Sequence, residues 1–292
     1  MLDRLKSVLQ DPPPAMAFEI SEAGISSARI GSRAELDFAP LPAGALAVSP
    51  LKENVIDEDA FAQTVRSLIS SQKRKEVALI LPDFCTRIAV LDFDSFPSEP
   101  KEQASLIRFR LKRSLPFDAE SAALSYFAQP TLRKHIDVVA VLTPQEIVAR
   151  YEAPFRAAGL NPGLVTTSSM AALELAAESG LSVIAKITGR VITVLVREKS
   201  TLKLVRCLEI PSIHLDDISA VLAPTLVYVE DNLGGRAERL LLCGFGPQSE
   251  EAQRRFEPEF GRAVEIMRSP LGVPGEGNAG LLGYLRSIAR NN

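Results

Sequence analysis

The sequence contains one pattern of strands twice, and this repeat limits the folds that the chain can form. A strand, a tight turn and further strands are predicted near Ala17 and again near Val183, and each copy is followed later by helices. The expected strands are 17–20 and 25–30 in the first copy and 183–187, 191–196 and 202–210 in the second. The repeat predicts two related α/β halves that divide near Gly180, with a cleft between them and a hairpin turn of each half pointing into it.

The segments between these strands are predicted from their residue patterns. Apolar runs predict buried strands at 77–81, 87–93 and 240–243, and helical spacing predicts helices at 98–115, 145–158, 218–233 and 280–289. Residues 38–50 are expected to form a loop, and 161–163 a turn. A helix rich in Ala and Leu should begin at Ser168 or Ser169 and end near Gly180.

Composition excludes several classes of function. The chain has 292 residues and a formal net charge of -3, so it lacks the basic surplus of a nucleic-acid-binding protein. Its three cysteines and two histidines are isolated in the sequence, which argues against a disulfide framework, a zinc site and a catalytic triad. No apolar run is long enough for a transmembrane helix, and residues 1–14 do not resemble a secretory signal, so we expect a cytoplasmic protein.

The middle of the chain carries the most specific motif. It reads EVALILPDFCTRIAVLDFDSFPSEPKEQASLIRFRLKRSLPFDAESAALSYF, followed by DVVAVLTPQEIVARYEAPFRAAGLNPGLV. This stretch resembles the PilM family of type IV pilus assembly, in which a strand ending in Pro precedes a short strand, a charged helix, a Leu-Pro-Phe type of turn and an acidic segment. The two hairpins and the Gly-Phe-Gly turn after 240–243 are similar to those of the actin, Hsp70 and sugar-kinase superfamily.

This resemblance implies an α/β, actin-like (ribonuclease H-like) fold with two lobes. Residues 1–180 would form the first lobe, including an inserted small subdomain of the FtsA and PilM type at about 77–165. Residues 181–292 would form a shortened second lobe. The resemblance also implies a scaffold at the inner face of the cytoplasmic membrane, in a type IV pilus or related secretion system. Its partner would be the cytoplasmic tail of a PilN-like protein with one membrane span, so membrane association would be indirect, and self-association remains open.

In this superfamily an acid in each hairpin turn holds the magnesium-bound water, and glycines let backbone N–H groups approach the phosphates. In the first turn Glu19 falls at the acid position, but Ser21 stands where glycine is expected. Glu22 adds a second negative charge, which would cost on the order of 4 kcal/mol beside another charge about 4 Å away.

The second and third turns depart further from the family pattern. Lys186 replaces the carboxylate and Thr188 replaces the glycine. The third turn keeps Gly244 and Gly246, with Phe245 between them where it could crowd an adenine ring. These changes predict a pseudo-ATPase with no expected cofactor, in which ATP and magnesium would bind only if the degenerate site still accepts them. We further expect Glu19 and Lys186 to form a salt bridge across the cleft, the alternative being that both are solvated.

The predicted helix at 98–115 is the candidate partner surface. Its cations Arg108, Lys112 and Arg113 surround Phe109, which could be an apolar anchor or part of the core. The alternative is that the cations form a solvated face.

Two other functions remain open at this stage. One is an active actin-like ATPase that uses Glu19 with another acid, such as Asp216 or Glu230. The other is an FtsA-like membrane tether that forms filaments. Such a tether would need an exposed amphipathic helix, whereas we expect the closing helix at 280–289 to pack in the core. A short helix at Leu2, Leu5 and Leu9 could dock on the body or act as an anchor.

Overall fold

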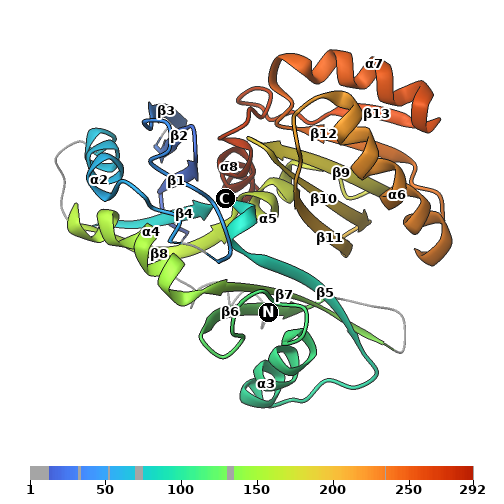
Figure 1. The fold of residues 1–292 in the computed structure, drawn as a ribbon, viewed down its shortest axis with the longest axis horizontal. Coiled ribbons are helices and arrows are strands. Elements are labelled where there is room, and N and C mark those ends of the chain that lie inside the picture. The colour runs from blue at the N-terminus through green and yellow to red at the C-terminus, as the bar shows by residue number, and fades with distance from the viewer. Residues whose placement is uncertain are drawn as a thin grey trace.

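The computed structural model describes residues 13–31, 34–51, 53–69, 75–129, 135–233 and 235–291. The helix expected at Leu2–Leu9 lies outside these residues. Two five-stranded sheets and one three-stranded sheet make up the molecule (Figure 1). No helix in the described ranges is both long enough and apolar enough to cross a membrane.

The first two sheets have the same topology. In the first, the strand order is β3-β2-β1-β4-β8, and in the second it is β11-β10-β9-β12-β13. Each contains three antiparallel strands followed by two that run parallel to the central one. The first sheet consists of β1 Met16–Ser21, β2 Gly24–Ile30, β3 Ala34–Pro40, β4 Lys75–Leu81 and β8 Leu160–Thr167. The second consists of β9 Leu181–Thr188, β10 Val191–Glu198, β11 Thr201–Glu209, β12 Arg239–Cys243 and β13 Ala263–Ile266. The predicted repeat of two α/β halves is therefore confirmed.

Helices cover both sheets. Helices α2 Glu58–Ser67 and α4 Gln145–Ala157 pack on the first sheet, around the buried side chains of Phe61, Tyr151 and Phe155. On the second sheet, α6 Leu215–Leu233 and α7 Ser249–Phe260 complete a separate apolar cluster. Residues 210–214 join β11 directly to α6.

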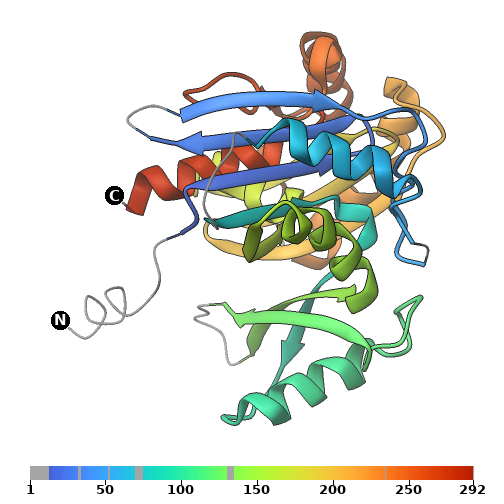
Figure 2. The same cartoon turned by 90° about the vertical axis from the view of Figure 1, so that its left-hand side faces the viewer.

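A third apolar cluster joins the two lobes. It contains residues of both sheets together with α5 Ser168–Ala172, the 3-10 turn η2 Leu173–Leu175 and α8 Ala279–Asn291. Figure 2 shows α8 beneath the strands of the first lobe. Leu281, Leu282 and Leu285 of α8 are buried, which confirms that the closing helix belongs to the core. An FtsA-like tether would need another membrane-binding segment.

The inserted subdomain extends away from both lobes (Figures 1 and 2). It contains β5 Arg87–Phe93, α3 Pro100–Leu111, β6 Ala122–Ala128 and β7 Ile136–Pro144, and its strand order is β5-β7-β6. Ile107 and Leu111 of α3 pack on this small sheet, as their spacing predicts. Both β4 and β8, which fall within the expected 77–165 insertion, are strands of the first sheet instead.

Three local predictions were wrong. Residues 38–40 of the expected 38–50 loop belong to β3, and the expected turn at 161–163 lies inside β8. Pro162 is tolerated because β8 is an edge strand whose register with β4 shifts at that point. The helix from Ser168 ends at Ala172 rather than near Gly180. Arg197 of the second lobe donates to the main-chain oxygens of Leu173 and Ala176, which stabilises this early end.

Candidate functional site: the base of the interlobe cleft

The hairpins of the two lobes bring charged side chains into the interior. Glu19 in β1 and Lys186 in β9 are only 1% and 2% exposed. Both belong to the central strand of their sheet, so backbone pairing on either side fixes their positions. The alternative that these two residues are simply solvated is therefore wrong.

Lys186 forms its ion pair with Asp83. The distance from Lys186 Nζ to Asp83 Oδ2 is 3.0 Å, and both side chains are almost fully buried. Asp83 begins the 3-10 turn η1 Asp83–Cys85, directly after β4 and Pro82 of the first lobe. The ammonium also donates to Thr188 Oγ1 at 2.7 Å. One ion pair thus joins the two lobes at the base of the cleft.

The Asp83 carboxylate accepts two further hydrogen bonds beside this pair. Its Oδ1 accepts the backbone N–H of Ser169 at 2.7 Å, and its Oδ2 accepts the hydroxyl of Thr193 at 3.1 Å. Burial lowers the pKa of the Lys186 ammonium, but the nearby carboxylates of Asp83 and Glu19 more than offset this effect, so the pKa is raised. Lys186 is therefore a permanent cation in the interior at neutral pH.

Glu19 has different partners. Its Oε1 accepts the hydroxyl of Ser168, and its Oε2 accepts the backbone N–H of Leu281 in α8 at 2.7 Å. Burial raises the pKa of the Glu19 carboxyl, although Lys186, Ser168 and Leu281 all favour the ionised form. The predicted Glu19–Lys186 salt bridge is wrong, because Lys186 pairs with Asp83 while the Glu19 carboxylate binds α5 and α8. The nearby Glu19 carboxylate helps to raise the pKa of Lys186, although the two side chains do not form an ion pair.

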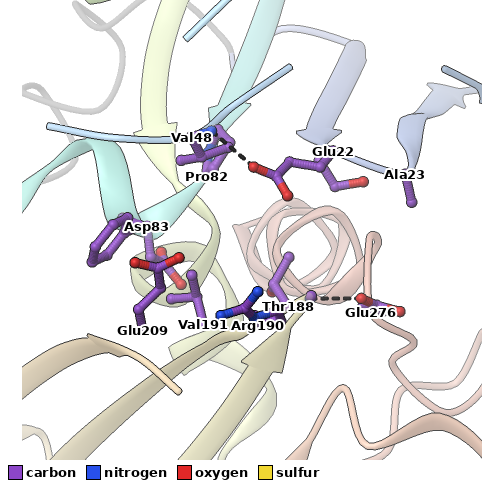
Figure 3. Close-up of a pocket in the computed structure, with 13 residues that line it drawn as sticks. Glu22, Ala23, Val48, Pro82, Asp83, Thr188, Arg190, Val191, Glu209 and Glu276 are labelled. Carbon is purple, nitrogen blue, oxygen red and sulfur yellow. Dashed lines mark hydrogen bonds between the residues drawn. The ribbon is translucent and has the colours of Figure 1, made fainter. Parts of the chain in front are cut away.

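A cavity lies in the cleft above the ion pair, between the two hairpin turns (Figure 3). Its lining includes the predicted site residues Ser21 and Thr188. The carboxylates of Glu22, Glu209 and Glu276 line it together with one cation, Arg190. Asp83 also lines it, but its charge is matched by Lys186. The lining is therefore acidic, which disfavours a triphosphate.

The chain itself occupies the backbone donors of this cavity. The N–H of Gly189, in the second hairpin turn, donates to Glu276 Oε1 at 2.6 Å (Figure 3). In the first lobe, Glu22 Oε1 accepts the N–H of Val48 at 2.8 Å. A carboxylate is an anion with acceptor oxygens, so Glu276 takes the kind of contact that a phosphate would make with a glycine turn.

The third turn retains the geometry that its glycines predict. Gly244 and Gly246 have φ values of +79° and +54°, and a side chain at Gly244 would collide with the backbone oxygen of Ile187. Phe245 is buried and packs edge-on against Phe256, with ring centroids 6.5 Å apart. Its ring belongs to the core of the second lobe. Phe245 nevertheless contributes to the lining of a second cavity beside Gly244 and Glu276.

The candidate partner surface on α3 divides into two kinds of residue. Arg108 is half-buried and donates hydrogen bonds to the main-chain oxygens of Ala119 and Ala122. It therefore holds the segment that leads from α3 into β6. Phe109 is 75% exposed, and Lys112 and Arg113 are also exposed. An exposed aromatic ring at the end of α3 is thus followed closely by two exposed cations.

The acids suggested for an active ATPase lie elsewhere. Asp216 pairs with Arg255 of α7, and Glu230 pairs with Arg262 at 3.1 Å. Neither residue lines the cavity between the hairpin turns. The arrangement of the described residues therefore offers them no role beside Glu19.

Two residues of the site were missed at the sequence level. Asp83 follows Pro82 at the carboxyl end of a buried parallel strand, where α/β sheets bind ligands, and this position was a usable signal. Glu276 lies in the loop before α8 and has no local pattern that marks it. Glu276 reaches Gly189 only because the loop before α8 passes close to the second hairpin turn in the folded chain.

Comparison with known proteins identifies the fold. No protein-family model matches the chain, and no curated protein sequence matches it. Among solved structures, an actin-like protein of unknown function from Bacteroides thetaiotaomicron matches 97% of this chain and 98% of its own, with 16% identity and a TM-score of 0.56. MreB5 of Spiroplasma citri bound to AMPPNP matches 97% of this chain and 98% of its own, at 10% identity and a TM-score of 0.51. The chain has the actin-like ATPase fold.

A third structure has a higher score than either. The chain matches a PilM–PilN type IV pilus biogenesis complex over 95% of its own length and 99% of the other chain, at 19% identity and a TM-score of 0.76. The expected PilM-like version of the actin fold is therefore confirmed.

Proposed function

We propose that this protein is a cytoplasmic scaffold of a type IV pilus or related secretion platform at the inner membrane, and that it does not hydrolyse ATP. The observation that supports the second part most directly is the buried Asp83–Lys186 ion pair. In the actin-like fold the base of the cleft receives phosphates and a metal. Here a cation and a carboxylate of the chain neutralise each other, and the nearest glycine N–H donates to Glu276.

The similarity to a PilM–PilN complex over nearly the whole chain supports the first part. The proposed partner is the cytoplasmic tail of a PilN-like protein with one membrane span, so the scaffold would be held at the membrane indirectly. We place the contact near the exposed face of α3, where Phe109 offers an apolar anchor and Lys112 and Arg113 offer cations.

The test is a titration of the full chain with a synthetic peptide of the cytoplasmic tail of the PilN-like protein from the same source. We expect saturable binding, weakened at least tenfold by Phe109→Ala and by the double variant Lys112→Glu/Arg113→Glu. Lys101→Glu is the matched control, because Lys101 is exposed at the opposite end of the same helix and should leave the affinity unchanged. Absence of binding by the unsubstituted protein contradicts the proposed partner. Equal binding by all variants contradicts only the contact on α3.

A further inference from the structure

The outer edge of the first sheet presents a second surface, separate from α3. Within the described parts of the chain, β3 is the last strand of its sheet and pairs with β2 alone (Figures 1 and 2). Leu36 and Phe38 are 43% and 50% exposed, which is high for two apolar side chains on one face of a strand. An edge strand with exposed apolar residues is a template for pairing with another segment.

The hydrogen bonds of β3 indicate which backbone groups point outward. The N–H of Phe38 donates at 2.8 Å to the side-chain Oδ1 of Asp37, and Phe38 stands opposite Ser26 in the antiparallel ladder. In such a ladder alternate residues point their N–H and C=O groups away from the neighbouring strand. Leu36 and Phe38 therefore present free edge groups, and Asp37 covers one of them.

The two faces of β3 differ in chemistry. Leu36 and Phe38 line a hollow together with Ser26 of β2 and with Asn278 and Leu281 near the start of α8, and Asp37 borders it as well. The carboxylates of Glu35 and Asp37 are exposed and alternate with these two residues, and Glu35 stands opposite the exposed Arg29 of β2, so Asp37 is the acid without a cation opposite it in this ladder. A strand that paired with this edge would place apolar side chains beside the hollow and its alternate side chains beside the two acids.

This charge pattern favours a basic partner strand and disfavours one way of pairing two copies. If two copies of this chain paired antiparallel through β3 about Leu36, Glu35 of one copy would lie opposite Asp37 of the other. Like charges directly opposite in a sheet are destabilising. A strand with Lys or Arg at these positions would instead form ion pairs. Such a cation would also draw the Asp37 carboxylate from the N–H of Phe38 and free that donor for the incoming strand.

We propose that β3 is a docking edge for an extended segment of a partner protein in which apolar residues alternate with Lys or Arg. The segment adds to the first sheet as a sixth strand, and main-chain hydrogen bonds at Leu36 and Phe38 supply the binding. Glu35 and Asp37 select the basic face of the partner. This surface is distinct from α3, so one scaffold can hold two partners.

The test uses the full chain and two blocked hexapeptides, one alternating lysine with valine and the other alternating glutamate with valine. We expect the basic peptide to bind at least tenfold more tightly than the acidic one, and to slow hydrogen exchange at the amides of Leu36 and Phe38. Asp37→Lys should abolish this preference, because it leaves one acid and one cation on the strand. Asp59→Lys, which makes the same charge change on exposed α2, should leave it intact.

Leu36→Pro provides an independent variant. It removes an outward N–H without removing a hydrogen bond to β2, so the fold should be retained and binding lost. Circular dichroism checks the fold, and the Asp37→Lys result stands alone if this variant does not fold. Equal affinity for both peptides overturns the proposal. A concentration-dependent dimer in sedimentation that Leu36→Pro dissociates also overturns it, because the occupant would then be a second copy.

Discussion

Lys186 Nζ lies 3.0 Å from Asp83 Oδ2, with the lysine on the central strand of one lobe and the aspartate at the end of a strand of the other. The pair is almost fully buried and has hydroxyl and backbone partners on both sides. The pair and these hydrogen bonds therefore help to fix the position of one lobe relative to the other.

Removing the cation should destabilise the fold strongly. Lys186→Met leaves Asp83 buried without its counter-ion, and breaking a buried pair in this way costs about 3–5 kcal/mol. The free energy of unfolding in urea measures the effect. The double variant Asp83→Asn/Lys186→Met removes both charges and should recover much of the loss. If the losses of Lys186→Met and Asp83→Asn simply added up in the double variant, a direct interaction between the two side chains would be contradicted.

Replacement of an exposed pair serves as the control for this experiment. Arg255 and Asp216 form an ion pair on the surface of the second lobe, where water screens the interaction. Arg255→Met should therefore change the free energy of unfolding far less than Lys186→Met does. A similar loss from both variants would show that burial of the Lys186 pair has no special consequence.

Glu19 should give the protein a distinct pH dependence. Burial raises the pKa of its carboxyl above the ordinary value of 4.5, so the folded state keeps the proton to higher pH than the unfolded chain. The contribution of Glu19 to stability is present below pH 4.5 and is lost as the pH rises through its folded pKa. The slope within this window is at most about 1.4 kcal/mol per pH unit.

The variant Glu19→Gln isolates the pH-dependent contribution of Glu19 to stability, because a glutamine side chain cannot titrate. As the pH rises above 4.5, the original protein should lose unfolding free energy relative to Glu19→Gln. The difference should then become constant above the folded pKa. Urea denaturation at a series of pH values measures it. A difference that does not change with pH would contradict a raised pKa.

Glu276 should control access of anions to the second hairpin turn. Glu276→Ala frees the N–H of Gly189 and removes a negative charge from the cavity, so inorganic phosphate should perturb the amide resonance of Gly189 at millimolar concentration. Glu276→Gln keeps an acceptor oxygen but not the charge, and its response should be intermediate. The unsubstituted protein should show no response. Equal responses from all three proteins would rule out Glu276 as the occupant of this donor.

The packing of α8 on α5 should be sensitive to a single methyl group. A side chain at Gly283 would collide with the backbone oxygen of Ala171, so Gly283→Ala should lower stability by roughly 1–3 kcal/mol. Helix propensity alone predicts the opposite, a gain of about 1 kcal/mol. Ala289→Gly, at an exposed position of the same helix, should lose about 1 kcal/mol by propensity. Thermal unfolding of both variants decides, and a stabilised Gly283→Ala would contradict the close approach of the two helices.

The repeat of hairpins and the buried stripes could be predicted from the sequence because they are local patterns. The strands near Ala17 and Val183, the Ile107–Leu111 stripe of α3 and the core position of α8 all follow from apolar spacing. The strand β3 was missed although Leu36 and Phe38 alternate with Glu35 and Asp37, because five of its seven residues are solvent-exposed and it lacks a buried apolar run.

The site was predictable only in part. The turn residues Glu19, Ser21, Lys186 and Thr188 do lie at or near the base of the cleft, because hairpin turns of the repeated motif converge there. The partner of Lys186 could not be derived from charge alone, since Glu19 and Asp83 are both carboxylates near it. Which one pairs depends on α5 and α8, whose donors Ser168 and Leu281 bind Glu19.

The most direct test of the proposal that the cleft does not bind nucleotide is isothermal titration of the full chain with ATP and magnesium. Lys186 and Asp83 already neutralise each other where a metal and phosphates would bind, and the cavity above them is acidic. No saturable heat is therefore expected up to millimolar nucleotide. Micromolar binding of magnesium ATP would contradict this account.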